Sequence, residues 1–155
     1  DADETVAAIL VEEKKMGVKR LGFYRDFAAK AESIRVALRE QIDALKSDGQ
    51  TLAAYGAAAK GSTLLNFCGV SAADLAFAAD RSPHKQGKLM PGSHVPIVPA
   101  EELEKRTPDV ALLLAWNFAD EIIAQQSAYL KTGGRFLIPV PEVRLTKSSA
   151  LKTEV

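Results

Sequence analysis

One stretch of this chain constrains its fold more than any other: residues 110–114, Val-Ala-Leu-Leu-Leu, are apolar at every position. A strand with one face in water alternates apolar and polar residues, whereas a strand buried on both faces does not. Strands of the second kind occur chiefly in parallel sheets, where helices cover each side. The run therefore predicts a central parallel strand, over residues 109–115, in an α/β domain.

Strand-like and helical segments alternate along the rest of the chain after residue 50. Short apolar runs between turn residues predict strands, and apolar residues at three- and four-residue steps predict helices. The expected strands are 51–55, 75–79, 95–98 and 135–140, and the expected helices are 62–68, 100–105 and 117–131. Pro139 and Pro141 indicate that the last strand ends there or lies at the sheet edge, and the polar tail after Glu142 is expected to fray. The predicted fold class is α/β: a Rossmann-like open parallel sheet with helices on both faces.

Two helices are expected before the sheet. Apolar residues of a first short helix share one face, and Gly17 ends it. Over Leu21–Ser47, apolar residues recur at three- and four-residue steps, which predicts one long helix that ends before Gly49. We therefore divide the chain into a helical N-terminal segment, residues 1–48, and a Rossmann-like domain, residues 49–155.

The composition limits the classes of binding partner and the cellular location that are expected for the chain. Lys plus Arg and Asp plus Glu both number 20, so no overall basic field attracts nucleic acid or an anionic membrane. The single cysteine, Cys68, rules out an internal disulfide and suits a cytoplasmic location. No apolar run reaches the ~18 residues that a membrane span needs, and no signal-peptide pattern opens the chain. The first residue is Asp1 rather than Met, which suggests a piece of a longer protein.

A glycine- and alanine-rich segment, Gly56-Ala57-Ala58-Ala59-Lys60-Gly61, joins the first expected strand to the next helix. At this end of a parallel strand, the N–H groups and the dipole of the following helix favour an anion. Lys60 precedes Gly61, so the segment is not a Walker A loop. Ala58 stands where the dinucleotide fingerprint has its middle glycine. We interpret the segment as an anion-binding turn, with a tight packing turn as the alternative.

A second segment, residues 81–94, is too long for a simple connector. It carries Arg81, Lys85 and Lys88 and both histidines of the chain, His84 and His94. Since it follows a strand, it is expected to lie beside the glycine-rich turn and to help bind a diphosphate. The alternative is a solvated basic loop. A metal site is not predicted, because no clustered carboxylates or cysteines accompany the histidines.

Trp116-Asn117 follows the apolar strand at the same edge of the sheet. Asn117 is a typical N-cap, and Trp116 is a candidate for stacking on a base or a sugar. Asp80 ends the second strand, near the position of a ribose-binding acid in dinucleotide folds. The sequence offers no nucleophile–base pair and no convincing acid–base dyad, so no catalytic residue is predicted.

Three stretches carry a resemblance to a known family. They are residues 55–66, residues 80–87 with Pro91-Gly92, and residues 113–122 with 133–136. In this order they resemble the C-terminal domain of the C-methyltransferases that modify nucleotide-linked deoxysugars. The resemblance covers essentially the whole chain.

This resemblance implies a protein of three parts: a zinc-binding domain, a domain that binds S-adenosylmethionine, and a C-terminal Rossmann-like domain that helps hold the sugar nucleotide. It also implies that a base removes a proton alpha to a keto group, after which the carbanion attacks the donor methyl. The S-adenosylmethionine site and the base are expected upstream in the same chain, so the fragment alone should be inactive. Residues 1–48 are expected to pack on, or link to, that upstream domain.

The resemblance further implies a role in binding the nucleotide-sugar substrate. We assign that role to nine residues: Gly56, Ala57, Ala58, Ala59, Lys60, His84, Lys85, Trp116 and Asn117. Two alternatives stay open. One is an NAD(P)-binding oxidoreductase domain, in which Asp80 would hold a ribose. The other is a structural or oligomerising domain, in which the helix Leu21–Ser47 would carry the partner surface.

Overall fold

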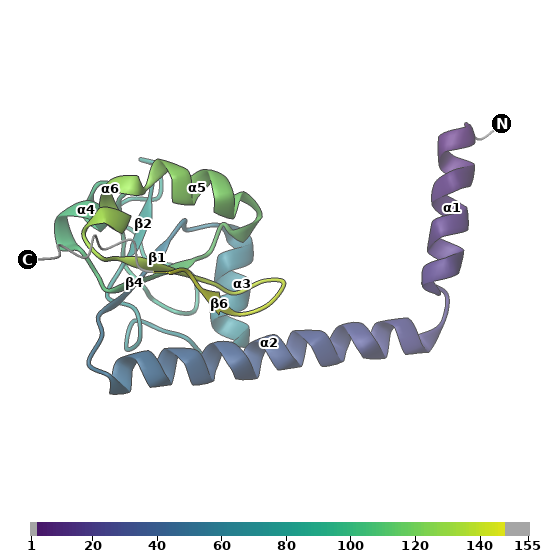
Figure 1. Cartoon of the computed structure of the whole chain (residues 1–155), viewed down its shortest axis with the longest axis horizontal. Coiled ribbons are helices and arrows are strands. Elements are labelled where there is room, and N and C mark those ends of the chain that lie inside the picture. The colour runs from purple at the N-terminus through teal and green to yellow at the C-terminus, as the bar shows by residue number, and fades with distance from the viewer. Residues whose placement is uncertain (1–2, 148–155) are drawn as a thin grey trace, which may run out of the picture. The chain divides into compact units, whose positions relative to one another are not determined.

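The structure, a computed structural model, describes residues 3–147 and divides the chain into two compact units, one up to Ser33 and the other from Ile34 onward. Helix α1 spans Glu4–Met16, and helix α2 spans Leu21–Ser47 (Figure 1). Gly17 ends α1 in the left-handed conformation, with φ 78°. Both helices therefore confirm the sequence prediction. The last turns of α2 belong to the second unit.

The second unit is built on a six-stranded sheet with the order β3-β2-β1-β4-β5-β6. All strand pairs are parallel except β5 with β6. The strands are β1 (Leu52–Tyr55), β2 (Ala78–Asp80), β3 (Ile97–Pro99), β4 (Val110–Leu113), β5 (Arg135–Ile138) and β6 (Arg144–Leu145). The strand order reverses between β1 and β4, which is where doubly wound sheets bind ligands. The predicted α/β class is confirmed, with β4 at the centre of the sheet.

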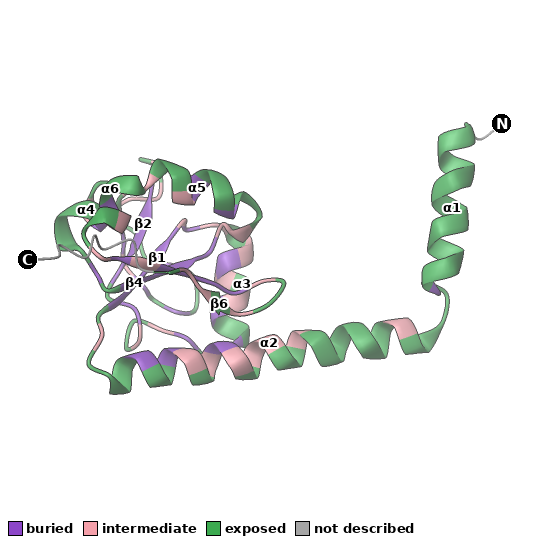
Figure 2. Ribbon diagram, viewed as in Figure 1, coloured by how far each residue is buried: buried purple, intermediate pink, exposed green. Residues whose placement is uncertain are grey.

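Helices cover both faces of the sheet and enclose two apolar cores (Figure 2). On one face lie α3 (Ala59–Phe67) and the last turns of α2, which contributes the buried Leu38, Ile42 and Leu45. On the other face lie α4 (Glu102–Arg106), α5 (Ala119–Gln125) and α6 (Ser127–Lys131), which contributes the buried Tyr129. This burial on both faces explains why the strands show apolar runs rather than alternation.

Two expected helices differ from the structure. The segment 117–131 is not one helix, because a 3-10 turn, η1 (Trp116–Phe118), precedes α5 and the backbone leaves the helix at Gln126. The Gln126 side chain donates a hydrogen bond to the Tyr55 hydroxyl at 3.0 Å. Asn117 lies inside the 3-10 turn, so its prediction as an N-cap is wrong. Helix α3 begins at Ala59 rather than Ser62, so the glycine-rich turn is shorter than expected.

The last part of the described chain also corrects the sequence prediction. Strand β5 ends at Ile138, two residues before the expected end at residue 140, and it is not the edge of the sheet. Strand β6 pairs beside it, although fraying was expected after Glu142. The Thr146 hydroxyl accepts the Phe136 N–H at 2.9 Å, which extends this pairing. Residues 148–155 of the expected frayed tail lie outside the described part of the chain.

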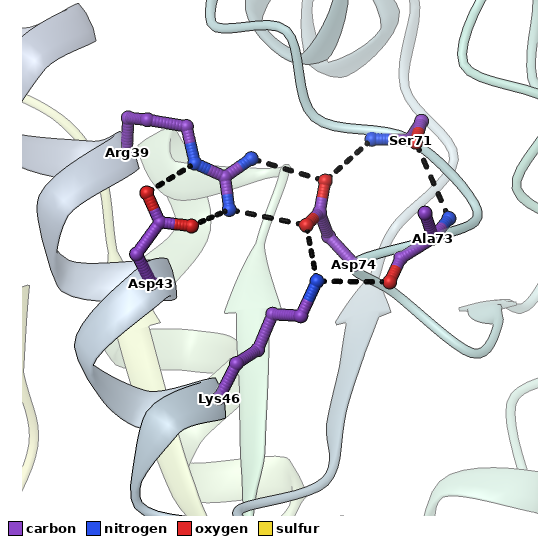
Figure 3. A network of polar contacts seen from close by, with 6 residues as sticks. All are labelled: Arg39, Asp43, Lys46, Ser71, Ala73 and Asp74. Atoms are coloured by element: carbon purple, nitrogen blue, oxygen red, sulfur yellow. Dashed lines mark hydrogen bonds and ion pairs between the residues drawn. The ribbon is translucent and has the colours of Figure 1, made fainter.

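An ion network fastens α2 to the turn that precedes β2 (Figure 3). Both terminal guanidinium nitrogens of Arg39, Nη1 and Nη2, donate to the Asp74 carboxylate, at 3.0 and 3.1 Å, and Lys46 donates to it at 2.7 Å. The Ser71 N–H adds a fourth hydrogen bond. Burial on its own raises the pKa of Asp74, but the hydrogen bonds from Arg39 and Lys46 outweigh it and lower that pKa to about 2. The network therefore holds the carboxylate charged and stabilises the packing of α2 on the sheet.

The Ser93 hydroxyl is a buried side-chain oxygen that finds no hydrogen-bond partner within residues 3–147. Burying a hydroxyl without a partner costs free energy. We therefore expect Ser93→Ala to raise the free energy of unfolding by about 1 kcal/mol, as measured by urea denaturation. In the control, Ser71→Ala removes a hydroxyl that accepts the Ala73 N–H and should destabilise the chain slightly. A clear loss of stability in Ser93→Ala would contradict the prediction.

Candidate functional site

The glycine-rich turn follows β1 where this strand pairs with β4, at the point where the strand order reverses. Gly56 has a φ of 88°, which an L-residue rarely adopts. A Cβ at Gly56 would lie 3.1 Å from the Cβ of Ala115. Helix α3 also lies close to β4, because a Cβ at Gly61 would lie 2.7 Å from the Cβ of Leu114. Gly56 and Gly61 thus serve the turn and the helix–strand packing that the first and third glycines serve in dinucleotide folds.

Asp80 connects the glycine-rich turn to the basic loop. Its carboxylate accepts the Ala57 N–H at 2.6 Å and the Ser82 N–H at 2.8 Å. Lys85 lies 3.4 Å from the same carboxylate. Asp80 is only 8% exposed. The Ala57 amide is therefore hydrogen-bonded within the chain, and Asp80 links the glycine-rich turn to the basic loop.

The amides at the start of α3 remain open. Within the described residues, the first helical N–H with a backbone acceptor after Ala58 belongs to Ser62, which donates to the Ala58 carbonyl at 3.1 Å. No side chain caps the helix. The N–H groups of Ala59, Lys60 and Gly61 therefore keep their capacity to donate, as at other helix N-termini that bind anions.

Lys60 and Trp116 meet at this rim. The Lys60 ammonium lies 4.5 Å from the centroid of the Trp116 ring, although the two residues are 56 positions apart in the sequence. Both residues are half-buried. The structure thus brings the glycine-rich turn and Trp116 together, as expected from the positions of the strand ends.

A crevice opens on the α5 side of the same rim. It is an open hollow of about 290 Å³ between the ends of β1, β2 and β4 and helix α5. Its lining residues are Tyr55, Gly56, Asp80, Arg81, Ala115, Phe118, Glu121, Ile122 and Gln125. Arg81 donates to the Gln125 side chain at 3.4 Å, and Tyr55, Arg81 and Gln125 also line a second hollow beside the first.

Most of these crevice residues were missed by sequence reasoning. Of the nine predicted site residues, Gly56 lines the crevice. Phe118 and Gln125 belong to the segment expected to be one regular helix, so the sequence did not indicate that they lie at the rim. A signal was available for Arg81, because it directly follows the strand that ends at Asp80.

The basic loop contributes less to the rim than expected. Its second half folds onto the sheet edge, where the Gly87 N–H donates to Ile97 and the Ile97 N–H donates to Lys88. Asn66 of α3 holds the Pro91 carbonyl at 2.9 Å. Lys85 forms an ion pair with Asp80, and His84 is exposed. Asn117 is exposed and lines a separate hollow beside β5.

Two negative observations apply to the described residues. Across residues 3–147, no group of three or more His, Cys, Asp or Glu side chains is arranged to hold a metal ion. No helix in the same part of the chain has the length and apolar character of a membrane span.

The fold and the position of the crevice define the structural class of the domain. An open, mostly parallel sheet with its crevice at the carboxyl ends of the strands is the architecture of Rossmann-type α/β domains. Residues 1–141 match the family described as "C-methyltransferase C-terminal domain". The chain therefore belongs to this family, which confirms the resemblance carried by the three sequence stretches.

A curated relative supports the same assignment. The chain is 42% identical over 145 residues to "C-methyltransferase NovU" of Streptomyces niveus, and the aligned region covers 94% of this chain. It covers 34% of that relative, so the chain spans about a third of the length of the protein it matches.

Proposed function

We propose that this domain binds the nucleotide-linked keto-deoxysugar of a C-methyltransferase, while the rest of a longer protein supplies S-adenosylmethionine and the catalytic base. The single observation that carries the proposal is the rim at β1 and β4, where Gly56 lines an open crevice and the unengaged amides and the Lys60 cation follow it at the start of α3. A diphosphate is attracted by the cation and by the helix dipole. The apolar part of the crevice, including Ala115, Phe118 and Ile122, suits the uncharged part of such a ligand.

The geometry supports different roles for eight of the nine predicted residues, and the ninth, Trp116, contacts Lys60. Lys60 and the amides at Ala59 and Lys60 are placed to contact phosphate oxygens, and Gly56 allows close approach of the ligand to the backbone. Ala57 and Ala58 shape the turn. His84 is exposed, Lys85 pairs with Asp80, and Asn117 lines a separate hollow. Their contacts with the ligand remain proposals that depend on loop movement or on the remainder of the protein.

One observation weighs against an adenosine-containing cofactor at this rim. In Rossmann-type dinucleotide sites, an acidic side chain at the end of the second strand binds the ribose of the adenosine. Asp80 stands there, but it is nearly buried and accepts hydrogen bonds from the Ala57 and Ser82 amides. The engaged state of Asp80 supports a methyl-donor site elsewhere in the longer protein, and it weighs against an NAD(P) site.

Titration of the chain with a dTDP-linked deoxysugar and with S-adenosylmethionine, followed by calorimetry, tests the proposal. We expect the nucleotide sugar to bind at least about tenfold more tightly than the methyl donor. Lys60→Gln should weaken nucleotide-sugar binding about tenfold, because it removes a charge-assisted hydrogen bond to phosphate. Lys105→Gln is the matched control, since Lys105 lies on exposed α4 and pairs with Glu102. Tighter binding of S-adenosylmethionine, or equal binding by Lys60→Gln, would contradict the proposal.

The first unit has a separate proposed role. Helix α1 has no buried residue, and Val6, Ile9, Leu10 and Val11 are each 44–57% exposed. Exposed apolar residues that cluster on one helix are typical of a docking surface. Because the chain spans 34% of its relative, we propose that these residues pack on the methyl-donor domain of the longer protein. A synthetic α1 peptide should compete with α1 for the methyl-donor domain in the whole enzyme. Absence of such competition would contradict this proposed role.

A further inference from the structure

The Lys60–Trp116 contact differs from the other lysine contacts of the domain. Lys46, Lys85 and Lys105 each pair with a carboxylate. Within residues 3–147, the Lys60 ammonium has no carboxylate within ion-pair distance, and its contact is the face of the Trp116 ring.

This difference matters for binding an anion. A lysine paired with a carboxylate has part of its charge compensated and must leave its partner to bind a phosphate. Lys85 is in this position, because Asp80 lies 3.4 Å from its nitrogen. An aromatic ring holds an ammonium by only about 0.5–1 kcal/mol at an exposed site and leaves its full charge in place. Lys60 therefore keeps both its charge and its hydrogen-bond donors for a ligand.

Both partners of the contact are fixed by the fold. Lys60 is the second residue of α3, which packs closely on β4 at Gly61. Trp116 directly follows Ala115, whose Cβ would lie 3.1 Å from a Cβ at Gly56. The ring and the ammonium are therefore held at the point where the ends of β1 and β4 meet.

We propose that Trp116 is a positioning residue, which holds the Lys60 ammonium at the rim rather than stacking on the ligand itself. This inference rests on the proposed function. It assigns the ring face to the cation, so the base and sugar of the ligand do not need that face. Removing the ring should then weaken ligand binding only because it displaces the Lys60 ammonium.

The contact can be tested without any ligand, because Trp116 is the single tryptophan of the chain. An adjacent ammonium attracts iodide and repels caesium, so iodide should quench Trp116 fluorescence more strongly than caesium. Lys60→Met should reduce the iodide-to-caesium quenching ratio about twofold. Lys105→Met, the matched control, should leave the ratio unchanged. An unchanged ratio in Lys60→Met would overturn the proposal.

A double-mutant cycle on dTDP binding tests the positioning role. We expect Lys60→Met to weaken binding about tenfold and Trp116→Leu about threefold. Trp116→Phe keeps an aromatic face and should recover part of the loss. The double variant should bind no more weakly than Lys60→Met alone.

Two outcomes separate the failure of this inference from the failure of the proposed function. Additive losses in the double variant would show that Trp116 contacts the ligand independently, and would overturn the positioning role. If the unsubstituted chain bound no dTDP, the proposed function would be contradicted instead. The iodide and caesium ratio would still decide whether Trp116 holds Lys60.

Discussion

Replacing Gly134 by alanine is expected to lower the free energy of unfolding by about 3 kcal/mol, as measured by urea denaturation followed by circular dichroism. A Cβ at Gly134 would lie 2.2 Å from the Tyr129 ring. Tyr129 is fully buried, and its hydroxyl donates to the carbonyls of Pro108 and Arg135 at 2.9 and 3.1 Å. Because the ring is fixed at both ends, it cannot move aside without losing these hydrogen bonds.

Gly133→Ala is the matched control for this prediction. Gly133 has a φ of 97°, but no atom lies within 4 Å of a Cβ placed there. Its substitution therefore measures backbone strain without the steric clash, and about 1 kcal/mol is expected. If Gly134→Ala unfolded at the same urea concentration as the unsubstituted chain, the close packing of Tyr129 would be wrong.

Local patterns predicted most of the elements of this fold. The helix Leu21–Ser47 was predicted with the bounds that the structure shows, because a long run of apolar residues at helical spacing leaves little choice. The apolar run at 110–114 likewise placed the central strand. Both signals are periodicities within one element, and the burial of that element produces them directly.

Elements that depend on distant contacts were predicted poorly. Strand β6 has only two residues, and it forms because β5 offers it an unpaired edge. The break at Gln126 coincides with a hydrogen bond to Tyr55, 71 residues away. No local pattern contains this information, since each feature depends on a partner that the fold supplies.

The candidate site shows the same division. Strand ends predicted that the glycine-rich turn and Trp116 share a rim, because carboxyl ends of parallel strands meet at one edge. They did not predict that Asp80 would engage the Ala57 amide, or that Lys60 would face the Trp116 ring. Those contacts depend on side-chain directions, which strand order leaves undetermined.

Among charged residues, we expect the largest effect of a substitution on the free energy of unfolding at Asp74 (Figure 3). Asp74→Asn should lower the free energy of unfolding at pH 7 by about 2 kcal/mol, as measured by urea denaturation. The substitution removes the charge that Arg39 and Lys46 share, while those two cations stay beside it. Asp43→Asn is the matched control, because Asp43 is an exposed partner of the same Arg39. It should cost no more than about 0.5 kcal/mol.

The pH dependence of this loss has a definite sign. The pKa of Asp74 is about 2 in the folded chain, against an ordinary value of 3.8. The unfolded chain therefore binds the proton more readily, and the carboxylate stabilises the fold only where it is charged. The difference in unfolding free energy between the unsubstituted chain and Asp74→Asn should stay constant above about pH 5 and shrink as the pH falls toward 2. A difference that persisted undiminished at pH 2, or that was matched by Asp43→Asn at pH 7, would show that the carboxylate does not fasten α2 to the sheet through its charge.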